Sequence, residues 1–150
     1  PFDFAADYEP AGGIDALRVG TPPVLSMSAL DAALDSFAGV DLGAVKAKAD
    51  ALFDLFVSDL PPEVQVLTPT DPERRGTQVS LRHPEAYAVM QALIARGVIG
   101  AFRQPDILRF GLTPLYLRFA DIARATAELR DILATRAWDR PDYKQRAKVV

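Results

Sequence analysis

The chain has 150 residues, of which 49% are hydrophobic and 25% charged, which is the size and balance of one ordinary domain with a buried core. Its net charge of −3 lacks the basic excess of nucleic-acid-binding proteins, so nucleic acid is not an expected partner. There is no cysteine, no apolar run of about eighteen residues and no signal peptide, so we expect a cytoplasmic protein with no membrane partner.

The first twenty residues show no hydrophobic periodicity and contain scattered prolines, glycines and aromatic residues. The sequence opens on Pro1 rather than methionine, so we expect a piece of a longer protein or a processed form. A long run without secondary structure is uncommon in a compact domain. We therefore predict that residues 1–25 form a connecting segment that lies against protein absent from this chain.

Two helices are predicted next. Apolar residues recur at helical spacing from Ser26 until Gly39 closes the segment. Asp41 then has the position of an N-cap for a longer amphipathic helix, which Pro61 and Pro62 stop.

The hydrophobic period then changes from 3.6 to 2. Residues 64–68 and 77–82 are rich in β-branched residues and are joined by a turn-rich connection, which predicts an antiparallel pair. Two further short strands are predicted at 98–103 and 107–111.

Two more helices complete the predicted elements. Pro84 has the position of a first helical residue, and Gly97 marks the end of that helix. A last long helix carries apolar residues from Phe119 to Leu133. This order predicts an α+β fold in which helices cover one face of a short, mostly antiparallel sheet. We place the domain in residues 26–138 and a polar tail in residues 139–150.

Counting residue types excludes most familiar catalytic sites. His83 is the single histidine, and its place before Pro84 favours a role at a helix start or on the surface over one in a catalytic triad. Without cysteine, only carboxylates remain as metal ligands, and no calcium-binding loop is present. We therefore predict no metal site.

Two positions remain unusual. The first is the run from Gly20 to Pro23, where the Thr21 hydroxyl and a helix N-terminus could contact a phosphate, although a rigid helix entry is the alternative. The second is Arg109, whose charge lies in an otherwise apolar strand and requires a partner such as a carboxylate. The alternative is an arginine that faces solvent on an edge strand.

Long blocks of the sequence resemble the C-terminal part of bacterial kynureninases over essentially the whole chain. These blocks are GTPPVLSMSALDAALDSFAGVD, PERRGTQVSLRHPEAYAVMQALIARGVIGAFRQPDILRFGLTPLYLRFADI and AWDRPDY. The resemblance implies a hydrolase that depends on pyridoxal 5′-phosphate (PLP) and has the aspartate-aminotransferase fold, fold type I. Such enzymes are homodimers that convert L-kynurenine or 3-hydroxykynurenine to anthranilate or 3-hydroxyanthranilate and L-alanine, in tryptophan catabolism and NAD biosynthesis.

The resemblance also implies roles for particular residues. This chain corresponds to the small C-terminal domain, whose partners would be a large N-terminal domain of the same protein and a second copy. Thr21 and Gly20 would contact the cofactor phosphate at the dimer interface, and Arg109 would hold the α-carboxylate of an amino-acid substrate.

The lysine that anchors the cofactor precedes this region in the family. The lysines of this chain are Lys46, Lys48, Lys144 and Lys148. The first two are expected on the exposed side of a helix and the others in the tail, so none is a credible anchor. The resemblance thus implies no catalytic residue here and an isolated chain that is inactive.

Two alternatives stay open. The chain could belong to another fold-type-I enzyme, such as an aminotransferase or a cysteine desulfurase-like protein. It could also be an interaction module that kept the fold without the chemistry, because fold alone does not determine function.

Overall fold

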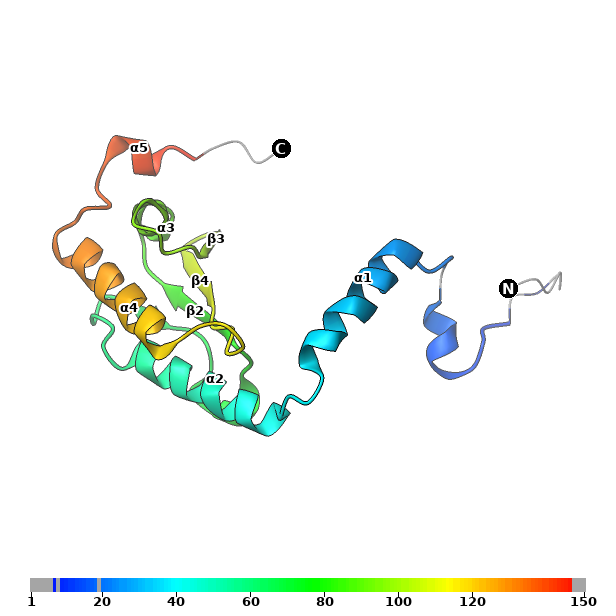
Figure 1. Ribbon diagram of the computed structural model, residues 1–150. Coiled ribbons are helices and arrows are strands. Elements are labelled where there is room, and N and C mark those ends of the chain that lie inside the picture. The colour runs from blue at the N-terminus through cyan, green and yellow to red at the C-terminus, as the bar shows by residue number, and fades with distance from the viewer. Residues whose placement is uncertain (1–6, 8, 19, 147–150) are drawn as a thin grey trace. The chain divides into compact units, whose positions relative to one another are not determined.

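A computed structural model describes residues 7, 9–18 and 20–146 (Figure 1). The chain divides into two compact units, Pro1–Val40 and Asp41–Val150. The boundaries predicted at residues 25 and 138 stay predictions, and the first falls inside helix α1 (Val24–Leu34). Within the described ranges, no helix combines the length and the apolar character needed to cross a membrane.

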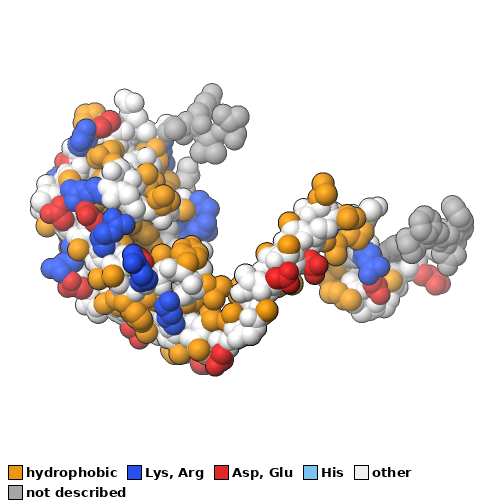
Figure 2. Space-filling view, viewed as in Figure 1, with side chains coloured by type: hydrophobic (Ala, Val, Ile, Leu, Met, Phe, Trp, Pro, Cys, Tyr) orange, Lys and Arg blue, Asp and Glu red, His pale blue; other side chains and the backbone are white. Residues whose placement is uncertain are grey.

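The first unit contains α1 between two short 3₁₀ turns, Gly13–Leu17 and Asp35–Phe37. The helix begins before the predicted start at Ser26, because Pro23 takes the N-cap position. None of the described residues of this unit is buried, and Leu25 on α1 is 87% exposed. Figure 2 shows hydrophobic side chains on the surface of this segment. The apolar positions of the predicted helix therefore find no core within their own unit.

The second unit holds the remaining elements. They are α2 (Leu42–Val57), β1 (Gln65–Val66), a 3₁₀ turn (Pro72–Arg74), β2 (Gln78–Arg82), α3 (Ala86–Ala95), β3 (Ala101–Arg103), β4 (Ile107–Gly111), α4 (Phe119–Ala134) and α5 (Pro141–Lys144). Helices combined with a small antiparallel sheet confirm the predicted α+β class (Figure 1).

Local signals set most of these boundaries. The Asp41 carboxylate accepts the Gly43 N–H at 2.8 Å and so caps α2 as predicted. Gly97 follows α3 with a φ of +78°, a conformation that favours glycine. The prediction that Pro84 is the first residue of α3 was wrong by two residues, because the helix begins at Ala86. The Ala86 N–H donates to the His83 carbonyl, which closes a turn ahead of the helix.

The sheet has the order β1-β2-β4-β3, and every neighbouring pair is antiparallel. Side chains alternate between its two faces, so Val79, Leu81, Leu108 and Phe110 are buried on one of them. These four residues join a single core with apolar residues of α2, α3 and α4. We call the opposite face, which carries Gln78, Ser80, Arg82, Arg103 and Arg109, the outer face.

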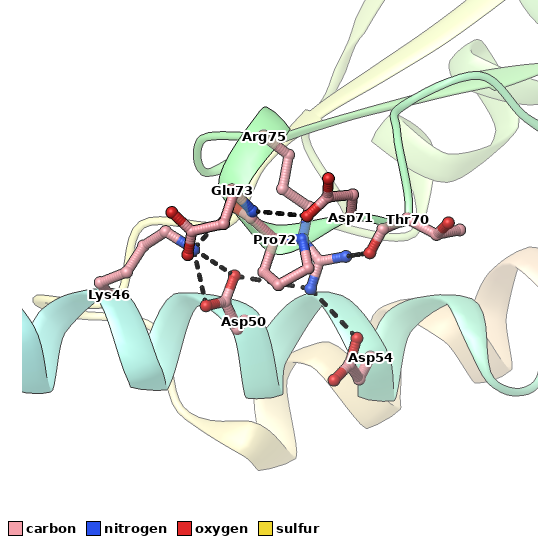
Figure 3. Close-up of polar contacts among 8 residues, drawn as sticks. All are labelled: Lys46, Asp50, Asp54, Thr70, Asp71, Pro72, Glu73 and Arg75. Atoms are coloured by element: carbon pink, nitrogen blue, oxygen red, sulfur yellow. Dashed lines mark hydrogen bonds and ion pairs between the residues drawn. The ribbon is translucent and has the colours of Figure 1, made fainter.

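A buried arginine attaches the β1–β2 connection to α2 (Figure 3). The Arg75 side chain is only 3% exposed, and its guanidinium lies 3.8 Å from the centre of the Phe53 ring. It pairs with Asp50 at 3.5 Å and Asp54 at 3.2 Å and also donates to the Thr70 carbonyl. This contact fixes the chain just before β2 begins.

Candidate functional site

Arg109 lies in the middle of β4, an interior strand of the sheet. Its cross-strand partners are Ser80 on β2 and Ala101 on β3. Adjacent Leu108 and Phe110 face the core, so Arg109 extends from the outer face and is half-buried. The alternative of an arginine on an edge strand is therefore wrong, because β4 has a neighbour on both sides.

The outer face around Arg109 is polar and basic. Arg82 pairs with Asp106 at 3.4 Å and donates to the Gln65 side chain at 3.3 Å. Arg103 is exposed and donates to the carbonyl of Phe102 at 3.0 Å. Both neighbouring arginines thus have a partner, and Asp106 uses Oδ2 on Arg82 while its buried Oδ1 makes no hydrogen bond with the described residues.

The Arg109 side chain, in contrast, makes no hydrogen bond or ion pair with any residue that the structure describes. Although the residue is half-buried, none of its side-chain nitrogens is among the fully buried atoms that lack a partner, so the guanidinium is open to solvent and can meet the charge of a ligand. Its planar fork matches a carboxylate through two parallel charge-assisted hydrogen bonds. This position can therefore bind an anionic, planar group.

Gly20 and Thr21 belong to the first unit and are both exposed. They precede α1, whose first backbone bond runs from Met27 N–H to the Pro23 carbonyl at 3.0 Å. The N–H groups of residues 24–26 therefore have no partner within the helix, and no side chain caps them. A hydroxyl beside such a helix start fits a phosphate group.

The described lysines are all engaged by the protein itself. Lys46 donates to Asp50 and to the Pro72 carbonyl, and Lys144 pairs with Asp139. Lys48 is not on the exposed side of α2 as predicted, because it is half-buried and donates to the Pro114 carbonyl at 2.6 Å. Lys148 lies outside the described residues. None of the three described lysines is free to anchor an aldehyde.

His83 is 8% exposed, so a surface role was the wrong expectation. It does lie at a helix start: Nδ1 accepts the Glu85 N–H at 3.1 Å, and the ring meets the Trp138 ring edge-on at 6.1 Å. Burial lowers the pKa of His83, while the carboxylates of Glu63 and Glu85 oppose that shift. The residue fixes the entry to α3.

Two features were not predicted from the sequence. Arg75 is buried although it lies in a polar, turn-rich stretch that suggests exposure. Ser80 lies directly opposite Arg109, and the alternation within 77–82 and 107–111 could have suggested a shared face only if the strand register had been known. Among the residues that the structure describes, no group of three His, Asp or Glu side chains is placed to hold a metal ion.

Comparisons with known proteins agree with this architecture. The family described as "Kynureninase C-terminal domain" matches residues 45–129, a range that contains the whole sheet and Arg109. A relative named "Kynureninase" from Burkholderia mallei (strain SAVP1) is 47% identical over 154 aligned residues, which cover 99% of this chain and 37% of the relative. A "Kynureninase" from Deinococcus radiodurans is 50% identical over 138 residues, covering 89% of this chain and 34% of the relative. The chain thus spans about a third of the length of these relatives, and by the match of the family over residues 45–129 it belongs to the kynureninase C-terminal domain family.

Proposed function

We propose that this chain is the C-terminal part of a kynureninase, a cytoplasmic hydrolase that converts L-kynurenine or 3-hydroxykynurenine to anthranilate or 3-hydroxyanthranilate and L-alanine. This reaction belongs to tryptophan catabolism and NAD biosynthesis. Family membership and relatives named kynureninase along nearly all of the chain support the proposal. The chain covers 37% of the first relative. Its partners in this proposal are a large N-terminal domain of the same protein and a second copy.

The observation that carries the proposal is the Arg109 side chain on the outer face, which pairs with none of the residues that the structure describes. An amino-acid substrate presents a planar α-carboxylate, and a guanidinium on an interior strand can hold both of its oxygens. The rigid strand then fixes the substrate about its α-carbon. Orientation of this kind lowers the barrier because the reacting bond is held in a productive position.

Pyridoxal 5′-phosphate, when bound, supplies the electron sink for breaking a carbon–carbon bond. Within this chain, Gly20 and Thr21 would hold its phosphate: the glycine permits close approach of the backbone, and the threonine donates its hydroxyl. The anchoring lysine would come from the N-terminal domain, since the described lysines here are engaged elsewhere. We therefore propose that the chain alone does not turn over substrate.

The test is to replace Arg109 with lysine in the full-length, PLP-loaded protein and to measure anthranilate release from L-kynurenine. Lysine keeps the charge but loses the fork, so kcat/KM should fall about 10- to 1000-fold, while bound PLP stays normal. Arg103→Lys is the matched control, since Arg103 shares the outer face and, among the described residues, its side chain bonds to a backbone carbonyl and to no side chain. Wild-type kcat/KM in Arg109→Lys would show that Arg109 does not bind the substrate.

A further inference from the structure

Ser80 is the polar side chain directly opposite Arg109 on the outer face. The two residues are partners in the antiparallel β2–β4 pair, and Ala101 is the partner of Arg109 on its other side. Directly opposed residues extend from the same face with Cβ atoms about 4.5–5.5 Å apart. The Ser80 hydroxyl therefore lies next to the Arg109 side chain, and Ala101 contributes no polar group.

The hydrogen bonds that Ser80 makes with the described residues do not use the hydrogen of its hydroxyl group. Its backbone N–H donates to Thr68 Oγ1 at 2.9 Å, which holds the strand in place at this residue. Its Oγ accepts from Gln78 Nε2 at 3.4 Å. A hydroxyl group also has one hydrogen to donate, and in the described part of the chain no acceptor receives it. The Ser80 hydroxyl can therefore still donate a hydrogen bond to a ligand.

A donor beside an unpartnered guanidinium suits an anionic oxygen. The two oxygens of a carboxylate offer about four acceptor positions, and a bidentate arginine occupies two of them. Asp106, the carboxylate near this face, pairs with Arg82 through Oδ2, and its Oδ1 is buried and makes no hydrogen bond with the described residues, Ser80 and Arg109 included. The remaining acceptor positions of a bound carboxylate would be open to the Ser80 hydroxyl.

We propose that Ser80 donates a hydrogen bond to the same substrate α-carboxylate that Arg109 holds. Ser80 is then a binding residue that favours amino acids with a free α-carboxylate over amines that lack one. This inference rests on the proposed function, because it assigns a second residue to the same site.

The test uses the full-length, PLP-loaded protein with Ser80→Ala and Ser80→Thr. Ser58→Ala is the matched control, since the Ser58 hydroxyl donates to the Leu55 carbonyl at the end of α2. Three quantities are measured: kcat/KM for L-kynurenine, the dissociation constant of L-alanine, and the inhibition constant of kynuramine, the analogue without the α-carboxylate.

Ser80→Ala should weaken L-alanine binding and lower kcat/KM for L-kynurenine about 10- to 100-fold, as expected for a lost hydrogen bond to a charged group. Kynuramine inhibition should be unchanged. Ser80→Thr, which keeps the hydroxyl, and Ser58→Ala should behave like the wild type. In the double variant with Arg109→Lys, the loss should be smaller than the product of the two single losses, because both residues act on one group.

Equal weakening of kynuramine and L-kynurenine by Ser80→Ala would overturn the inference, as would unchanged L-alanine binding. The wild-type protein could bind L-alanine more tightly than Ser80→Ala does and yet release no anthranilate from L-kynurenine. That result would support the role of Ser80 and refute the proposed substrate. A wild-type protein that binds neither L-alanine nor L-kynurenine would overturn both proposals.

Discussion

Replacing Arg75 tests what holds the β1–β2 connection onto α2 (Figure 3). The guanidinium stacks on Phe53 within a nearly fully buried environment, where a cation–π contact contributes up to about 2 kcal/mol. The three buried methylene groups of the side chain add about 2 kcal/mol at roughly 0.8 kcal/mol each. Arg75→Ala should therefore lower the free energy of unfolding by about 3–4 kcal/mol.

The ionic contacts of Arg75 should matter less. Asp54 is 71% exposed, so its ion pair is worth at most about 1 kcal/mol, and Asp50 keeps Lys46 as a second partner. Arg75→Met keeps the apolar stem but loses the cation–π contact, and it removes a buried Nε that has no hydrogen-bond partner, so it should cost about 1–2 kcal/mol, roughly half as much as Arg75→Ala.

The assay is urea denaturation of the chain followed by far-UV circular dichroism at low and high salt. Asp54→Asn is the control for the ion pair and should shift the midpoint only slightly. If Arg75→Met were as destabilising as Arg75→Ala, the apolar stem would contribute nothing. If Asp54→Asn matched either variant, the ion pair rather than the contact with Phe53 would hold the connection. Either result would refute our reasoning.

Two further predictions concern His83 and Gly100. Because burial lowers the pKa of His83 below its ordinary value of 6.5, the unfolded chain binds this proton at higher pH than the native chain does, so the free energy of unfolding should fall as the pH drops below about 6.5 and level off once native His83 is protonated. Urea midpoints measured from neutral to mildly acidic pH should show this fall, and His83→Gln should flatten it; an unchanged profile would contradict the assignment. Gly100→Ala would place a Cβ 2.9 Å from the Phe110 ring and should cost about 1–3 kcal/mol by overpacking. Gly76→Ala, which has open space around its Cβ, is the matched control in the same denaturation assay, and equal midpoints for the two variants would show that the core absorbs the extra methyl group.

Features set by nearby residues could be predicted from the sequence. Asp41 as a cap, Gly97 as a helix end and the alternation of 77–82 depend on side chains a few positions away, and the structure agrees with each. Boundaries were less accurate: α2 ends at Val57, before Pro61 is reached, and the strand predicted at 64–68 is confined to Gln65–Val66.

Features set by distant residues could not be predicted in this way. Lys48 is half-buried because its ammonium reaches the Pro114 carbonyl, which is 66 positions away in the chain. His83 is buried against Trp138 for a similar reason. For the candidate site, the sequence pointed to Arg109 as an unusual charge, but its neighbour Ser80 follows only from the strand register, which no local pattern specified.

The register of β2 against β4 links the packing of the core to the placement of Arg109. Arg109 and Leu108 are consecutive, and one faces outward while the other lies in the core. A slip of one residue would exchange their faces, burying a charge and exposing a leucine. The strand register that pairs Leu81 with Leu108 also places position 80 opposite position 109. Selection for a well-packed core alone would thus preserve the placement of the arginine, and a misaligned sheet would lose its core together with the outward position of Arg109.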